Sequence, residues 1–300
     1  MITSLDQMVE KVIASGVRCR IAVAWAQEHN LIAAVGRAAQ NGFAEAILIG
    51  NSDAVISECR KAGINRKHFE IINAKDDSEA SEEAVRLVNT GAADIVMKGL
   101  VSTGKFLKAV MDRNNGLMIP GSVLSYVATV EIPAYNKLLF ITDPAVIPYP
   151  DLDQRIKMAG YAIDLANKFG ISVPRMALIG PSEILSSRFP YYGDYATLCE
   201  MSKSDQIKNC IIDGPIDLFL ACDKNSVEIK GVNTPVNGDA DILMFPSLES
   251  ANPFYKALML FAGGELAGII RGTRRPVIVM SRSESEKSKY YCIALACLMN

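Results

Sequence analysis

The hydrophobic positions of this chain fall into short continuous runs that alternate with stretches of helical spacing. In the first third the runs are RIAVAW (20–25), EAILIG (45–50), FEIINA (69–74) and ADIVMK (93–98). Helical stretches follow them at about 29–41, 52–62, 78–90 and 104–112. Continuous apolar strands separated by helices are typical of a parallel sheet covered on both faces. The first third is therefore predicted to be a doubly wound α/β unit.

The middle of the chain has a different order of strand-like and helical segments. The strand-like runs VLSYVATVEI (123–132) and KLLFITDPAV (137–146) are separated by a short connection, which predicts an antiparallel excursion. A helix is predicted over 151–170, with Asp151 and Asp153 near its start and Gly170 past its end. A second sheet is predicted from RMALIG (175–180), NCIIDG (209–214), DILMFP (241–246) and ELAGIIRG (265–272).

At the end of the chain a strand is again followed by a helix, with the predicted strand RPVIVMS (275–281) and an apolar helix at about 284–299. A chain of 300 residues is long enough for two domains. We therefore predict two doubly wound α/β domains, the second inserted into the first. The first domain would comprise 1–136 with 270–300, and the second 137–269. Such an architecture predicts an interdomain cleft, where ligands usually bind.

Composition excludes several classes of function. The formal net charge is -2, so no overall positive field favours nucleic acid or a membrane surface, whereas small anions remain possible through local clusters. The seven cysteines are odd in number and scattered, which fits reduced thiols. The start MITSLDQMVEKVIAS lacks the apolar core of a secretory signal. The longest apolar run, Tyr290–Met299, is too short to span a bilayer. We expect a cytoplasmic protein.

Only two histidines occur, His29 and His68. A Ser-His-Asp triad or a histidine-rich zinc site would need one of them, and neither stands beside a nucleophile or a carboxylate cluster. We predict no metal site, and we expect both histidines at the surface.

The stretch MKGLVSTGKF (97–106) nearly matches a nucleotide-binding P-loop. Gly99, Gly104 and Lys105 stand where the pattern G-x-x-x-x-G-K-[ST] requires them. The last position is Phe106, however, which cannot hold Mg²⁺ as a hydroxyl would. A true ATP site is therefore disfavoured.

The same stretch still favours an anion. A strand runs into a glycine turn with Ser102 and Thr103, and a helix begins there whose N-terminal N–H groups face outward. Lys98 adds a positive charge nearby. The alternative is an ordinary strand–helix turn capped by Ser102 or Thr103.

A second candidate stretch is GIIRGTRRPVIVMSRSES (268–285). It holds four arginines, which are Arg271, Arg274, Arg275 and Arg282. Arginine recognises phosphate by paired hydrogen bonds. Ser281 and Arg282 follow a strand at its carboxyl end, where open α/β sheets place ligands. A solvated charged loop would explain Arg274 equally well.

A third stretch is GDADILMFPSLESANPFYKAL (238–258). Glycine and acids precede a buried strand, and a polar group of Ser247, Glu249, Ser250 and Asn252 stands before a helix. This group indicates either helix capping or a third site corner.

Five segments together resemble the phosphate acetyl/butyryltransferase family. They are MKGLVST (97–103), ITDPAV (141–146), IDGPIDL (212–218), the third stretch and RPVIVMSRSES (275–285). The resemblance runs from about Gly91 to the C-terminus and is most like the phosphate butyryltransferase branch. It implies the isopropylmalate-dehydrogenase-like fold, usually a homodimer, and reversible formation of acyl phosphate from acyl-CoA and inorganic phosphate. CoA and phosphate would be substrates, with no cofactor or metal.

The resemblance also implies roles for individual residues. Arg282 would bind phosphate and Ser281 the oxyanion or thioester carbonyl, while Lys98, Ser102 and Thr103 would bind phosphate or acyl phosphate. Candidates for CoA contacts are Arg275, Arg271, Asn252 and Lys256.

One position departs from the acetyl-specific branch. That branch has an aspartate, proposed as the base for the CoA thiol, seven residues after the serine, where this chain has Ser288. Glu284 and Asp143 are the substitutes we consider. The departure favours a butyryl or branched-chain substrate.

Two other classes remain open. Metal- and NAD-dependent decarboxylating dehydrogenases share the implied fold but need aspartates grouped around a divalent metal, and no dense cluster stands out. A non-catalytic acyl-CoA-binding regulatory module is the third possibility, and binding without turnover would reveal it.

Overall fold

The computed structural model describes residues 1–65 and 69–300. His68, which we expect at the surface, lies outside the described residues. The chain divides into two compact units, each described here by itself. One comprises residues 5–124 and 265–300, and the other residues 1–4 and 125–264. The chain of the second unit is thus inserted into that of the first. The domain boundaries predicted at 136/137 and 269/270 stay a prediction.

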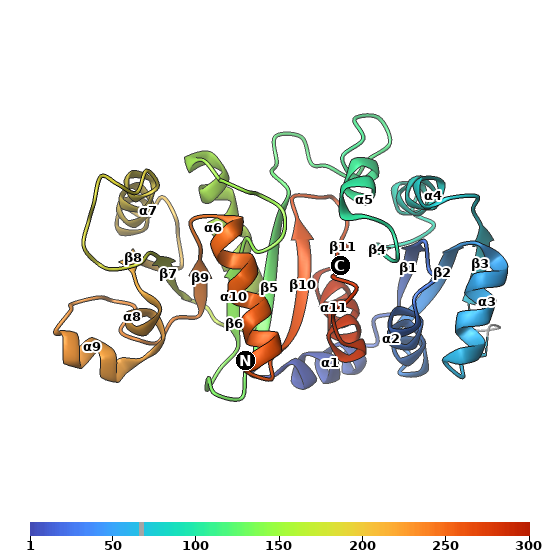
Figure 1. Ribbon diagram of the computed structural model, residues 1–300, viewed down its shortest axis with the longest axis horizontal. Helices are drawn as coiled ribbons and strands as arrows, with labels where there is room; N and C mark the ends of the chain where they lie inside the picture. The colour runs from blue at the N-terminus through green and yellow to red at the C-terminus, as the bar shows by residue number, and fades with distance from the viewer. Residues whose placement is uncertain (66–68) are drawn as a thin grey trace. The chain divides into compact units, whose positions relative to one another are not determined.

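The unit of residues 5–124 and 265–300 is a doubly wound α/β sheet (Figure 1). Its strands are β1 (Cys19–Ala24), β2 (Ala44–Gly50), β3 (Phe69–Asn73), β4 (Ile95–Lys98), β10 (Glu265–Arg271) and β11 (Val277–Ile278). Its helices are α1 (Leu5–Ala14), α2 (His29–Gln40), α3 (Ser52–Lys61), α4 (Asp77–Asn89), α5 (Thr103–Val110) and α11 (Glu286–Met299). The strand order is β3-β2-β1-β4-β11-β10, parallel except that β10 runs antiparallel to β11.

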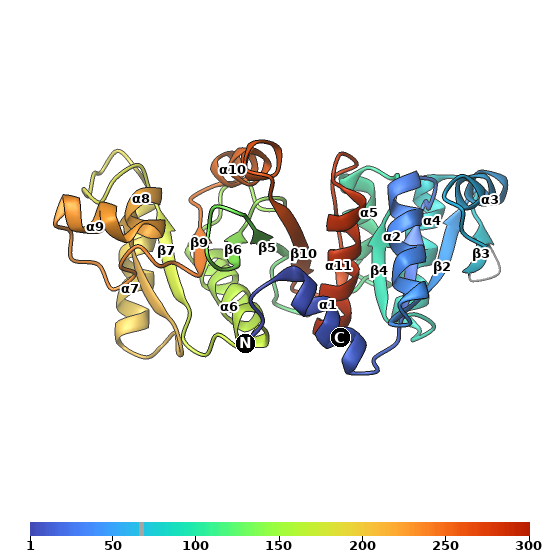
Figure 2. The same ribbon diagram turned by 90° about the horizontal axis from the view of Figure 1, so that it is seen from below.

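The core of this unit follows from its continuous apolar strands. Strand β4 is wholly buried and β1 nearly so, because helices cover both faces. Helices α4 and α5 pack together on one face, and α2, α3 and α11 lie on the other (Figure 2). Helix α11 is buried from Ser288 to Cys297, as expected for a helix that is apolar on all sides.

The unit of residues 1–4 and 125–264 has its own mixed sheet. Its strands are β5 (Ser125–Glu131), β6 (Leu139–Thr142), β7 (Arg175–Ile179), β8 (Ile211–Ile216) and β9 (Ile242–Met244), in the order β5-β6-β9-β7-β8. Its helices are α6 (Leu152–Lys168), α7 (Tyr192–Lys203), α8 (Leu218–Cys222), α9 (Lys224–Lys230) and α10 (Leu248–Phe261). Strands β5 and β6 are antiparallel, which confirms the predicted excursion.

Some elements differ from the sequence prediction. Helices α1, α7, α8 and α9 were not predicted, because the apolar-run pattern located strands first and left these segments as connections. Strand β11 was predicted over 275–281 but pairs only at Val277–Ile278. The reason lies in β10, where the N–H groups of Leu266 and Gly268 bond to Ser288 Oγ and Cys292 Sγ of α11.

Among the described residues, no helix combines the length and the apolar character needed to cross a bilayer.

Candidate functional site: the carboxyl ends of β1, β4 and β11

The carboxyl ends of three neighbouring parallel strands meet at one edge of the first sheet. Ala24 of β1 lies opposite Lys98 of β4, and Ile278 of β11 lies opposite Met97. The loops that follow these strands are therefore adjacent. This is the edge at which open α/β sheets bind ligands.

The loops after β1 and β4 are packed backbone to backbone. Gly99 donates its N–H to Ala24 O at 2.8 Å, and Leu100 donates to Trp25 O at 2.9 Å. A side chain at position 99 would place its Cβ 2.5 Å from Trp25 O, which no real contact allows. Position 99 of the near P-loop is thus a glycine because two strand-end loops touch there, whatever ligand binds.

Lys98 is the last residue of β4, and its side chain is 5% exposed. Its Nζ donates to the carbonyl oxygens of Gly99 at 3.1 Å and Val101 at 3.0 Å. Burial, reinforced by the charge of Arg282, lowers the pKa of Lys98 to about 8. Glu28 and Glu284 act in the opposite direction. The sequence prediction that Lys98 and Arg282 share one site is consistent with this interaction.

Ser102 and Thr103 begin helix α5 and are both exposed. Ser102 is the N-cap, and its Oγ accepts the N–H of Lys105 at 3.3 Å. The Lys105 ammonium forms an ion pair with Asp77 at 2.8 Å. The lysine of the apparent P-loop therefore has a carboxylate partner of its own, and the anion-favouring charge at this corner is Lys98.

The residues after β11 form a turn that carries Ser281, Arg282 and Glu284. Ser281 Oγ accepts the N–H of Ser283 at 3.3 Å, and its carbonyl accepts the N–H of Glu284 at 3.4 Å. Ser281 and Glu284 are partly buried, whereas Arg282 is exposed. The three side chains predicted for the chemistry thus lie on one short turn at the strand end.

A buried lysine of helix α11 is hydrogen-bonded to the backbone of this turn. Lys289 is 2% exposed, and its Nζ donates to Glu284 O at 2.8 Å, to Arg282 O at 3.4 Å and to Glu28 Oε1 at 3.1 Å. Glu28 immediately precedes α2, in the loop after β1. Neither Glu28 nor Lys289 was predicted. The one signal available for Lys289 was its position as the last charged residue before the apolar run of the final helix.

The electrostatic balance of this edge is positive. Three cations interact here, namely Lys98, Arg282 and Lys289, against two carboxylates, Glu28 and Glu284. Lys289 is compensated by Glu28 in an ion pair. The charges of Lys98 and Arg282 repel each other, and both Glu28 and Glu284 attract Lys98. An arrangement of this kind is stabilised by a bound anion.

Ser288 lies away from solvent, with 2% of its surface exposed. Its hydroxyl donates to Glu265 and accepts the N–H of Leu266 at 3.0 Å. Ser285, the N-cap of α11, donates to the same Glu265 oxygen at 2.7 Å. Ser288 is thus a structural link between α11 and β10 in this chain.

The structure does not bring Arg271 and Arg275 together with Lys98 and Ser281. Arg275 precedes β11, and Arg271 ends the antiparallel β10. Both arginines therefore lie at the opposite end of these strands from Lys98 and Ser281. Arg275 donates to the Asn300 side chain at 3.2 Å. Their assignment to CoA stays a prediction without support from this placement.

Asp143, Asn252 and Lys256 belong to the other unit. Asp143 is 2% exposed and accepts the N–H groups of Ala145 at 2.8 Å, of Val146 at 2.9 Å and of Tyr126 at 3.1 Å. Burial raises its pKa. These hydrogen bonds hold the turn after β6, and the assignment of Asp143 as a thiol base stays a prediction.

Asn252 supports the same turn from helix α10. Its Nδ2 donates to Pro144 O at 2.8 Å. Lys256 follows one helical turn later and is exposed. Asn252 therefore lies near the carboxyl end of β6, and the assignment of Asn252 and Lys256 to CoA stays a prediction.

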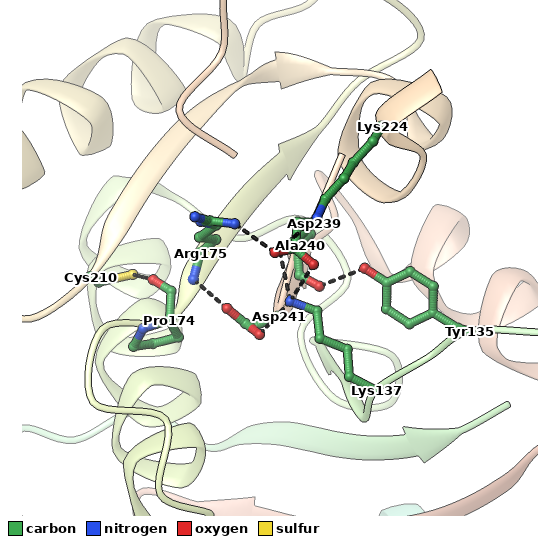
Figure 3. A network of polar contacts seen from close by, with 9 residues as sticks. All are labelled: Tyr135, Lys137, Pro174, Arg175, Cys210, Lys224, Asp239, Ala240 and Asp241. Carbon is green, nitrogen blue, oxygen red and sulfur yellow. Dashed lines mark hydrogen bonds and ion pairs between the residues drawn. The ribbon is translucent and has the colours of Figure 1, made fainter. Parts of the chain in front are cut away.

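The acidic residues of the third stretch have a different role (Figure 3). Lys137 Nζ lies 2.7 Å from Asp241 and 3.0 Å from Asp239. Arg175 pairs with Asp239 at 2.6 Å, and its N–H donates to Asp241 at 2.8 Å. Lys137 precedes β6, Arg175 is the first residue of β7, and Asp239 and Asp241 precede β9, so all four lie at the amino ends of parallel strands. The network therefore fixes strand register and lies away from the ligand-binding edge of its sheet.

No group of three or more histidine, cysteine, aspartate or glutamate side chains suited to a metal ion occurs within residues 1–65 and 69–300.

Comparisons with known proteins agree with the resemblance carried by the five segments. The family model described as phosphate acetyl/butaryl transferase matches residues 78–297. A phosphate butyryltransferase of Clostridium acetobutylicum is 38% identical over 299 residues, covering 100% of this chain and 99% of that protein. A phosphate acetyltransferase of Thermotoga maritima is 35% identical over 292 residues, covering 97% and 98%.

A solved structure is similar over nearly the whole chain. It is a branched-chain phosphotransacylase from Enterococcus faecalis V583, with a TM-score of 0.81 and 27% identity, covering 93% of this chain and 98% of that one. The predicted fold class of two α/β domains is thereby confirmed.

Proposed function

The chain belongs to the phosphate acetyl/butaryl transferase family, and from this premise we propose that it is a phosphate acyltransferase. It transfers a short- or branched-chain acyl group reversibly between CoA and inorganic phosphate. The observation that carries the proposal is the positive edge of the first sheet, where the charges of Lys98, Arg282 and Lys289 stand against those of two carboxylates, Glu28 and Glu284. A phosphate dianion supplies the missing negative charge.

The residues of this edge account for the first half of the reaction. Arg282 and Lys98 hold phosphate by charge-assisted hydrogen bonds, with Ser102 and Thr103 at the α5 terminus offering further donors. A phosphate oxygen then attacks the thioester carbonyl, forming the new C–O bond. Ser281 donates to the oxyanion of the tetrahedral intermediate. Removing one such donor costs about 3–4 kcal/mol of barrier in known cases.

The second half breaks the C–S bond. The CoA thiolate leaves, and the proton that the phosphate brought as HPO₄²⁻ passes to the sulfur. Glu284 relays this proton, and in the reverse direction it accepts the proton of the CoA thiol. The turn places Glu284 three residues after Ser281, within the same short segment. No covalent enzyme intermediate is needed, and holding both substrates in attack geometry contributes about 7–11 kcal/mol in well-oriented cases.

The acyl chain is proposed to be butyryl, isobutyryl or a similar group. The support is the butyryltransferase of Clostridium acetobutylicum and the branched-chain phosphotransacylase among the similar proteins. We further propose a cytoplasmic homo-oligomer. All seven cysteines lie in the described residues as free thiols, which supports a reducing compartment.

The experiment is CoA release, read with a thiol reagent, from acetyl-, butyryl- and isobutyryl-CoA with and without phosphate. We expect phosphate-dependent release in the presence of a metal chelator and without NAD, fastest with a four-carbon chain. CoA binding without release from any of the three would support the regulatory module instead. Metal-dependent NAD reduction with a hydroxy acid would support the dehydrogenase class.

A further inference from the structure

Lys289 and Glu28 form a largely buried ion pair, which is weak evidence for a gain in folding stability. The side chains are 2% and 18% exposed, and Nζ lies 3.1 Å from Oε1. Removing two charges from water costs several kcal/mol per ion, and an apolar pair of similar volume is often as stable or more so. Stability alone therefore does not explain a lysine in a helix that is otherwise buried and apolar from Tyr290 to Cys297.

The hydrogen bonds of Lys289 indicate another role. An ammonium has three donors, and Lys289 has three acceptors, which are Glu28 Oε1, Arg282 O and Glu284 O. Two of them are backbone atoms of the turn that follows Ser281. The third belongs to the loop after β1. Every donor is thus used to hold the turn after β11 against the loop after β1.

We propose that Lys289 is a positioning residue of the phosphate site: paired with Glu28, it fixes the turn that carries Ser281, Arg282 and Glu284 beside Lys98. The inference rests on the proposed function, because it assigns phosphate to this edge. Lys289 does not contact substrate. It acts through the two carbonyl groups that it binds, and a displacement of about 1 Å in such a turn can cost about 10²-fold in rate.

The pair also acts on Lys98 through its charges. The charged groups that influence Lys98 are Arg282, Glu28, Glu284 and Lys289. The positive charge of Lys289 lowers the pKa of Lys98, and the negative charge of Glu28 raises it. Neutralising one partner at a time should therefore shift the titration of Lys98 in opposite directions.

The test compares Lys289→Met, which keeps the volume, with Glu28→Gln, which keeps an acceptor. The matched control is Lys287→Met on the exposed side of the same helix, where Lys287 contacts the Tyr291 ring. Each variant is measured for kcat and KM with phosphate across pH, and for binding of inorganic phosphate by calorimetry.

For Lys289→Met we expect kcat/KM for phosphate to fall by about 10²-fold, with the KM for acyl-CoA unchanged. The alkaline limb of the pH profile moves to higher pH in Lys289→Met and to lower pH in Glu28→Gln. Lys287→Met behaves as the wild type. If Lys289→Met does not fold, phosphate binding by Glu28→Gln, which weakens the hold on Lys289, still decides the matter: weaker binding supports the positioning role and equal binding refutes it.

Wild-type kcat/KM in Lys289→Met, or an alkaline limb that stays in place in both variants, would overturn the inference. Failure of the proposed function is separate, because wild-type protein would then release no CoA with phosphate. In that case calorimetry still tests the positioning role. Phosphate binding weakened in Lys289→Met supports it, and equal binding in both proteins refutes it.

Discussion

Lys98 ends β4 and Arg282 follows the neighbouring parallel strand β11, and the charge of Arg282 adds to burial in lowering the pKa of Lys98 to about 8. The positive charges of Lys98 and Arg282 repel each other. A phosphate dianion bound between them would turn this repulsion into two attractions. The proposed phosphate site therefore depends on both residues and on the protonation of Lys98.

The first prediction concerns pH. Because only protonated Lys98 attracts phosphate, kcat/KM for phosphate should fall above about pH 8, by about tenfold per unit. Lys98→Arg should move this limb to higher pH, since guanidinium keeps its proton. Lys98→Ala should raise the phosphate KM by about 10- to 100-fold. ATP should not bind to Lys98→Ala or to Lys98→Arg. An unchanged phosphate KM in Lys98→Ala would refute the assignment.

The second prediction concerns Ser288, where the acetyl-specific branch has an aspartate. Ser288→Asp would bury a second carboxylate against Glu265, to which the Ser288 hydroxyl donates. We expect the free energy of unfolding to fall by about 2–3 kcal/mol and no gain in activity. Urea denaturation measures the loss.

The double variant Ser288→Asp with Glu265→Gln is its control. Removing the Glu265 charge should restore much of the lost stability, because the like-charge contact disappears. A single variant as stable as the wild type, or one that is more active, would contradict the structural role of Ser288.

The candidate site could be predicted only in part from the sequence. The rule that open α/β sheets place ligands at the carboxyl ends of their strands indicated Ser281 and Arg282, whereas Lys98 was grouped with them by the family resemblance. A cap at Ser102 or Thr103 was predictable because both residues stand just before a helical stretch, and Ser102 is the N-cap of α5. Such local patterns require no knowledge of which helix packs where.

The remaining residues depend on tertiary contacts. Lys289 meets Glu28 across the fold, and no spacing rule links a position in the last helix to the loop after the first strand. Likewise, the sequence grouped Arg275 with Ser281 because they are close in the chain. A strand lies between them and carries them to opposite ends of the sheet. The three backbone N–H donors to Asp143 also come from tertiary contacts and turns that the sequence does not show.

The third prediction concerns the network of Figure 3. Asp241→Asn removes the charge that pairs with Lys137 at 2.7 Å but keeps an acceptor for the Arg175 N–H. We expect the free energy of unfolding to fall by about 1–3 kcal/mol, with the phosphate KM of the folded enzyme unchanged. Glu228→Gln, an exposed change in the same unit, is the control. A raised phosphate KM in Asp241→Asn would show that the network belongs to the site.

The most direct test of the phosphate site is the phosphate KM of Arg282→Met beside that of Arg274→Met. Arg274 lies before β11 and donates to Asn89 at 3.1 Å and to Gly116 O at 2.8 Å. Arg274→Met therefore removes the same charged group at a position away from the proposed site. We predict that Arg282→Met raises the phosphate KM by about 10- to 100-fold, with the acyl-CoA KM unchanged, and that Arg274→Met leaves both constants as they are. Equal phosphate KM values in Arg282→Met and the wild type would contradict the account.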